Sequence, residues 1–170
     1  MTLPSIDVRD LMGHPGASRE HAVSGTLEGL AIELVRVPGD VPVTADVLLE
    51  SVVEGILVTG TIRGTWVLRC ARCLTEFEAP FEVAVSELFA PSPDEDADAY
   101  PLAPEAEIDP DQMLRDAIGV EMPFSPLCRS DCLGLCEVCG GNRDLGECPG
   151  HERQDPRFAV LSELRLPDEN

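Results

Sequence analysis

Residues 61–89 read TIRGTWVLRCARCLTEFEAPFEVAVSELF, and this stretch decides the fold. Residues 61–70 and 77–89 are rich in Val, Thr and Phe, the composition that β-strands favour. Between the two runs lies CARCL, residues 70–74. Strand, turn and strand predict a hairpin with a Cys-x-x-Cys pair at its tip. This is the shape of a zinc knuckle, in which a tight turn aims both sulfur atoms at one point.

Two earlier runs extend the pattern. Residues 22–36, AVSGTLEGLAIELVR, alternate small or apolar with polar side chains, and residues 44–59, TADVLLESVVEGILVT, do so less regularly. Successive strands joined by short turns predict an antiparallel sheet. In the second run, Leu48, Val52 and Ile56 are also spaced as on one face of a helix, so a helix is the alternative there.

Two Asp-Pro pairs predict helix starts, at Asp109-Pro110 and at Asp155-Pro156. Asp accepts hydrogen bonds from the free N–H groups of a first turn, and Pro suits the first helical position. Each helix carries an apolar stripe that is expected to pack on the core. The stripe residues are Met113, Leu114, Ala117, Ile118 and Met122 in the first helix, and Phe158, Leu161 and Leu164 in the second.

Together these patterns predict an α+β fold: an antiparallel β-rich domain of about four to six strands, two docked helices and a cysteine-rich zinc-knuckle segment. Residues 1–90 would form the β-rich domain with the first Cys-x-x-Cys knuckle. Residues 91–111, rich in Pro and acids, would form a linker with little apolar mass to pack. Residues 112–170 would supply a helix, the cysteine-rich segment and a C-terminal helix that packs back on the same domain.

The second cysteine region, residues 128–151, reads CRSDCLGLCEVCGGNRDLGECPGH, and all seven cysteines lie in these two regions. Structural zinc takes four ligands, so seven Cys and His151 are enough for two sites. The simplest partition places Cys70, Cys73, Cys128 and Cys132 in one site and Cys136, Cys139, Cys148 and His151 in the other. The alternative is a single ribbon-like site of Cys70, Cys73, Cys136 and Cys139. Gly140 and Gly141 suit a knuckle because they allow unusual φ values.

The composition limits the classes of partner and of chemistry. The net charge of −20 comes from 32 acidic residues against 12 basic ones, and such a surface repels nucleic acid phosphates and favours a basic protein partner. The N-terminus does not resemble a signal peptide, so we expect a cytoplasmic protein, where clustered thiols indicate metal rather than disulfides. Thiolate-rich zinc sites are structural, and the sequence contains no catalytic triad, phosphate loop or His-Glu-x-x-His motif, so we expect no enzyme activity.

At this point the chain resembles the YceD-like family of large ribosomal RNA subunit accumulation proteins. Four stretches carry the resemblance: IDVRDLMGHPG near the start, CARCLTEFEAPFEV, DCLGLCEVCGGNRDLGEC, and DPRFAVLSEL near the end. Only the cysteines and the flanking residues at Arg72 and Leu74 match the family's signature residue by residue. Many long members have a further cysteine after the position of Cys148, where this chain has His151, and a stretch like NLN where this chain has GNRDL.

The resemblance implies a bacterial cytoplasmic factor needed for accumulation of 23S rRNA, with a tie to a small basic large-subunit ribosomal protein or a pre-ribosomal particle. The ligand count, independently, predicts one or two structural zinc ions. The resemblance implies no catalytic residue. One alternative is a zinc module that binds rRNA directly through an arginine patch of Arg63, Arg69, Arg72 and Arg129. A weaker alternative is a thiol-based redox sensor. We expect no membrane association and no small-molecule substrate.

Overall fold

The structure is a computed structural model, which describes residues 3–91, 93 and 98–151. Its main sheet is built on four long antiparallel strands in the order β2 (Ser18–Gly25), β5 (Val43–Ser51), β6 (Ile56–Arg69) and β7 (Glu76–Ala90). Three two-residue strands extend it: β3 (Ala31–Ile32), β4 (Val35–Arg36) and β8 (Tyr100–Pro101), the last parallel to β7. β1 (Ile6–Asp7) and β9 (Glu107–Ile108) form a separate two-stranded ladder. The antiparallel β-rich fold is confirmed, and the short strands raise the number of strands above the expected four to six.

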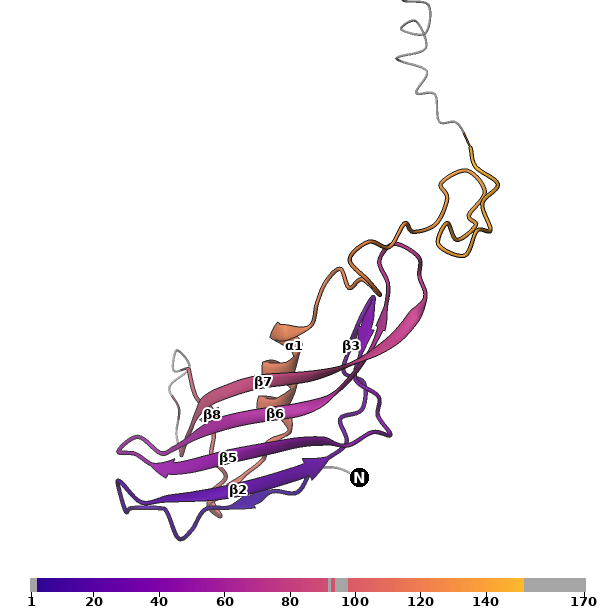
Figure 1. Ribbon diagram of the computed structural model, residues 1–170. Coiled ribbons are helices and arrows are strands. Elements are labelled where there is room, and N and C mark those ends of the chain that lie inside the picture. Colours follow the sequence, from indigo (N-terminus) through magenta and orange to yellow (C-terminus); the bar gives the residue numbers. More distant parts are fainter. Residues whose placement is uncertain (1–2, 92, 94–97, 152–170) are drawn as a thin grey trace, which may run out of the picture.

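The β6–β7 hairpin is longer than the rest of the sheet. Its strands have 14 and 15 residues, but β5 pairs with β6 only as far as Arg63. From Gly64 to Arg69, β6 continues paired to β7, and on its other side it pairs with β4 at Val67 and Leu68. Figure 1 shows this part of the hairpin leaving the sheet as an arm, with the cysteine-rich segment beyond its tip. The sheet therefore places the CARCL turn away from the main core.

One face of the sheet is buried beneath the helix α1 (Asp111–Glu121). Inward side chains of the strands, such as Val58 and Ile62, are fully buried, as are Leu114 and Ile118 of α1. The helix begins close to the predicted Asp109-Pro110 pair, but Pro110 is the N-cap residue rather than the first helical residue. The carboxylate of Asp109 still accepts a hydrogen bond of 3.0 Å from the Asp111 N–H. In Figure 1, α1 lies behind the sheet, and no described element lies in front of it.

Several sequence predictions need correction. Residues 43–51 form a strand that ends at a turn closed by the Val52 N–H and the Gly55 carbonyl, so the helix alternative is wrong. The alternating run at residues 22–36 is not a single strand. Its first part belongs to β2, which ends at Gly25, and its last part forms the short strands β3 and β4. The second half of the expected linker instead supplies β8 and β9 and buries Leu102 and Ile108 in the core. The structure contains one helix among its described residues, and the second predicted helix, which starts at Asp155, lies outside them.

Gly60 shows how closely the strands pack. A Cβ added there would overlap the backbone oxygen of Asp46 and lie 2.8 Å from the Val47 Cα, and both are backbone atoms that cannot rotate away. We expect Gly60→Ala to lower the free energy of unfolding by about 2 kcal/mol or more, as overpacking does. Gly119→Ala is the matched control, because nothing lies within 4 Å of its added Cβ and Ala favours a helix by about 1 kcal/mol. Urea unfolding would measure both, and equal midpoints would contradict the prediction.

Candidate metal centre

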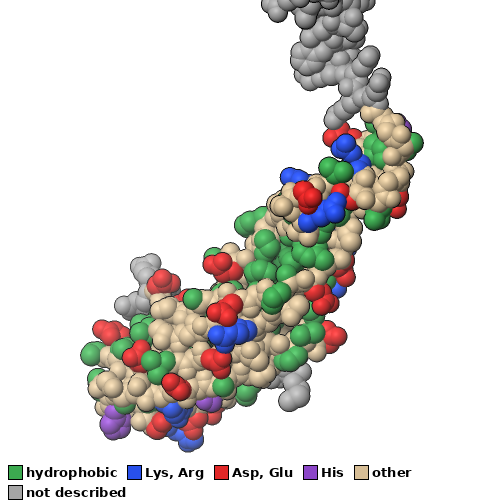
Figure 2. All heavy atoms as spheres, in the orientation of Figure 1, with side chains coloured by type: hydrophobic (Ala, Val, Ile, Leu, Met, Phe, Trp, Pro, Cys, Tyr) green, Lys and Arg blue, Asp and Glu red, His purple; other side chains and the backbone are tan. Residues whose placement is uncertain are grey.

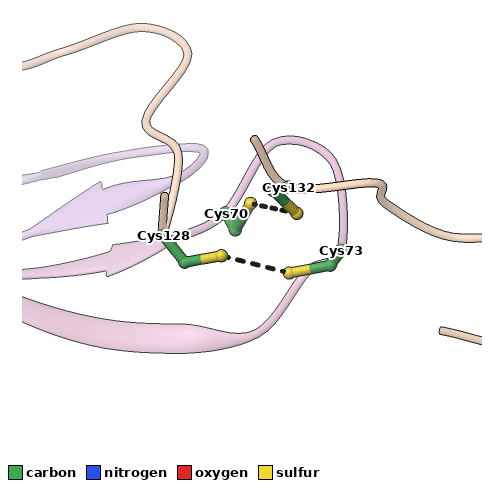
Figure 3. A group of neighbouring side chains, drawn as sticks. All are labelled: Cys70, Cys73, Cys128 and Cys132. Atoms are coloured by element: carbon green, nitrogen blue, oxygen red, sulfur yellow. Dashed lines mark hydrogen bonds between the residues drawn. The ribbon is translucent and has the colours of Figure 1, made fainter. Parts of the chain in front are cut away.

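The first cysteine group joins two distant parts of the chain. Cys70 and Cys73 lie in the turn of the β6–β7 hairpin, and Cys128 and Cys132 lie in the segment after α1. The four sulfur atoms lie within 4.8 Å of one another, with Cys70 Sγ 3.8 Å from Cys132 Sγ and Cys73 Sγ 3.7 Å from Cys128 Sγ. Figure 3 shows the four side chains pointing toward one another. Zn–S bonds of about 2.3 Å in a tetrahedron place sulfurs about 3.8 Å apart, so this group has the dimensions of a zinc site.

Backbone hydrogen bonds form the turn that presents Cys70 and Cys73. The Leu74 N–H donates to the Cys70 carbonyl, and the Cys70 N–H donates to the Thr75 carbonyl, both at 2.9 Å. Leu74 closes this turn with φ of 60°, a left-handed conformation that a leucine adopts only at a cost of about 1 kcal/mol or more. Its side chain is 53% exposed, so burial does not offset this cost. The tight turn that the spacing of CARCL predicts is present.

The segment after α1 is fastened to this turn by hydrogen bonds as well as by cysteines. The Ala71 N–H donates to the Pro126 carbonyl at 2.8 Å, and the Leu135 N–H donates to the Arg72 carbonyl at 3.0 Å. The Arg72 guanidinium donates to the Cys132 carbonyl at 2.9 Å. Arg72 therefore holds the two halves of the first group together.

The ionisation of the thiols differs within the first group. Burial raises the pKa of Cys70, but hydrogen bonds from the backbone N–H groups of Cys128, Cys73 and Arg72 outweigh it and lower the pKa to about 6. The Thr75 hydroxyl lowers the pKa of Cys73. Burial raises the pKa of Cys128, and it raises that of Cys132 to about 12. Hydrogen bonds therefore favour the thiolate forms of Cys70 and Cys73, whereas burial favours the protonated forms of Cys128 and Cys132.

The second group is local and more exposed. The ligand atoms of Cys136, Cys139, Cys148 and His151 lie within 4.8 Å of one another. Gly140, with φ of 72°, donates its N–H to the Cys136 carbonyl at 2.8 Å, so this glycine has the left-handed conformation that a knuckle requires. The backbone N–H groups of Cys139 and Val138 lower the pKa of Cys136 to about 6.

The eight side chains thus form the two groups of the simplest partition. Cys136 and Cys139 fall in a different group from Cys70 and Cys73, which argues against the single ribbon-like site. Sequence reasoning missed Asp144, which connects the groups. Its side chain is 12% exposed, pairs with Arg129, and accepts a hydrogen bond of 3.1 Å from the Leu133 N–H. In a sequence with 32 acidic residues, nothing distinguishes this half-buried carboxylate from the exposed ones.

Two of the four arginines of the expected patch are paired with carboxylates, and Arg63 lies apart from Arg69. Arg63 pairs with Asp46 and Glu82, and Arg129 pairs with Asp131 and Asp144. Arg63 and Arg69 are six positions apart on β6, which corresponds to roughly 20 Å of strand. In Figure 2, several basic side chains lie near the cysteine-rich end, next to acidic ones, and others lie singly on the sheet.

Comparison with known proteins identifies the family. The family model described as "Large ribosomal RNA subunit accumulation protein YceD" matches residues 58–165, a range that contains all eight side chains of the two groups. The chain belongs to the YceD family. An uncharacterized protein of Mycobacterium bovis is 39% identical over 96% of this chain and 82% of its own length.

Two further relatives show how far the YceD likeness extends. An uncharacterized protein of Mycobacterium leprae is 37% identical over 95% of this chain and 77% of its own length. The chloroplastic "Large ribosomal RNA subunit accumulation protein YCED homolog 1" of Arabidopsis thaliana is 36% identical over 35% of this chain and 19% of its own length. No solved structure matches the chain significantly. No helix among the described residues of this YceD family member has the length and apolar character needed to span a membrane.

Proposed function

We propose that this protein is a non-enzymatic, zinc-binding cytoplasmic factor that supports large ribosomal subunit biogenesis and accumulation of 23S rRNA. It would act by binding a basic large-subunit ribosomal protein, free or in a pre-ribosomal particle. The observation that carries the metal part is the first cysteine group, in which distant parts of the chain bring four sulfurs to tetrahedral spacing. The ribosomal part rests on the family and on the name of the Arabidopsis relative.

The donor set fits zinc in a structural role. Seven thiols and one imidazole are soft or borderline ligands, which suit Zn²⁺ better than hard cations. Each group offers four ligands, which fill a tetrahedron and leave no position for a reacting water. The metal would therefore fasten residues 126–135 to the hairpin turn and would rigidify the second group.

Zinc affinity is expected to fall steeply on acidification. Zinc binds thiolates, so binding at the first group releases the protons of Cys128 and Cys132, whose pKa values are raised. Each released proton lowers the affinity about tenfold per pH unit. Below pH 6, Cys70 and Cys136 also become protonated, which steepens the fall. Competition with a chromophoric chelator between pH 5 and pH 8 would measure the slope, and a pH-independent affinity would contradict thiolate ligation.

The net charge supports a basic protein partner rather than RNA. Carboxylates pair with Arg63 and Arg129 and offset their charges, so two of the four arginines of the RNA-binding alternative offer little free charge to phosphates. The test compares binding of the purified zinc-loaded protein to purified basic large-subunit proteins and to 23S rRNA fragments at several salt concentrations. Binding of the proteins alone supports the proposal. Binding of rRNA that is lost in the Arg63, Arg69 and Arg72 to Ala variant would establish the RNA-binding alternative.

The redox alternative is favoured by one observation, the lowered pKa of Cys136 in an exposed segment. Elemental analysis before and after mild peroxide treatment separates it from a structural role. We expect unchanged zinc content, and release of zinc with disulfide formation would favour a sensor.

A further inference from the structure

The face of the sheet opposite α1 has no covering element among the described residues. Strand register places its side chains in rows across four strands, for example Ala22, Asp46, Thr61 and Ala84, and the next row of Ser24, Thr44, Arg63 and Glu82. Figure 1 looks on to this open face, and Figure 2 shows its side chains in the same view. A four-stranded sheet with one bare face is a surface on which a partner can lie.

The open face is hollowed where its side chains are small. A trough of about 590 Å³ runs across β2, β5 and β6, bordered by Glu20, Ala22, Asp46, Leu48 and Thr59. Beside it, Leu57 of β6 and Leu88 of β7 lie directly opposite each other and are half-buried. The trough is large enough for several partner side chains, and the leucines supply an apolar strip at its edge.

Acidic side chains dominate the charge of this face. Glu20, Glu50 and Glu78 have no hydrogen-bond or ion-pair partner within the described part of the chain. Arg63 is held by Asp46 and Glu82 at 2.7 and 2.9 Å, so its charge is already neutralised. A second copy of this chain, with the same charge of −20, would be repelled from the face, and so would a phosphate backbone.

We propose that the open face of β2, β5, β6 and β7 is the docking surface for an amphipathic segment rich in Arg and Lys of a basic protein. The cations of that segment pair with Glu20 and Glu50, and its apolar side chains enter the trough and contact Leu48, Leu57 and Leu88. This inference rests on the proposed function and assigns the partner to one face, distinct from the cysteine-rich end.

The test uses the full zinc-loaded chain and two variants of equal net charge. Glu20→Arg with Glu50→Arg alters the open face, and Glu105→Arg with Glu121→Arg alters exposed carboxylates in the β8–β9 connection and at the end of α1. The probes are purified basic large-subunit proteins and a synthetic amphipathic Lys/Leu peptide, with affinity read by fluorescence anisotropy. We expect the first variant to bind about tenfold more weakly or worse, and the second to change affinity less than about threefold. Circular dichroism checks that both variants are folded.

Other outcomes overturn the inference in distinguishable ways. Equal weakening by both variants would mean that overall acidity, not this face, attracts the probe. If the first variant binds a basic large-subunit protein as tightly as the unmodified protein does, the docking-surface proposal is ruled out. The proposed function is not affected by that result. If the unmodified protein binds no basic large-subunit protein at all, both proposals fail. A dimer that the first variant dissociates would show that the face is occupied by a second copy.

Discussion

Cys132→Ala is expected to remove one of two zinc ions and to release residues 126–135 from the hairpin turn. Cys132 is 2% exposed, and its sulfur lies 3.8 Å from that of Cys70, so its loss opens the most buried corner of the first group. Structural zinc contributes about 10 to 16 kcal/mol of apparent binding energy in small zinc modules. Losing even a third of that would lower the melting temperature of a chain of this size by about 10 °C or more.

Two measurements and one control variant check this prediction. The zinc content measured by elemental analysis should fall from two ions per chain to one. Hydrogen exchange should accelerate at the amides of Ala71 and Leu135, which bridge the two segments. Cys148→Ala is the matched control: it should also leave one zinc ion, but with Ala71 still protected, because the second group lies outside the sheet. Full zinc content in Cys132→Ala would show that this thiol is not a ligand.

Ile118→Ala is expected to lower the free energy of unfolding by about 2 to 5 kcal/mol, the usual cost of a cavity at a fully buried site. Ile118 is 0% exposed and lies on the face of α1 that covers the sheet. Because the cysteine-rich segment follows directly from α1, loosening the helix should also raise the zinc dissociation rate of the first group. Val120→Ala, at a position 81% exposed on the same helix, should change stability by less than about 0.5 kcal/mol. Similar urea midpoints for the two variants would contradict the docking of α1.

The sequence predicted those features in which local pattern and global fold agree. The strand-like runs on both sides of CARCL predicted the hairpin, and Asp109-Pro110 predicted where α1 begins. The four-ligand requirement of structural zinc predicted that Cys70 groups with Cys128. It failed where tertiary packing overrides composition: the acidic 98–111 stretch is held because Leu102 and Ile108 enter the core. It also missed Asp144 and the left-handed Leu74, whose roles depend on neighbours far along the chain or on strain that residue type does not reveal. Sequence also did not show that carboxylates on adjacent strands pair with Arg63, one member of the expected arginine patch.

The split of the first group between the hairpin tip and the segment after α1 has a consequence for synthesis of the chain. Cys73 and Cys128 are 55 positions apart. At a translation rate of about 5 to 20 residues per second, the nascent chain carries the half-site of Cys70 and Cys73 for roughly 3 to 11 seconds before Cys128 and Cys132 are synthesised. During that interval the nascent hairpin can hold an ion only weakly and is open to capture by competing copper or to oxidation. Correct loading of the first group with zinc then depends on how quickly Cys128 and Cys132 are synthesised.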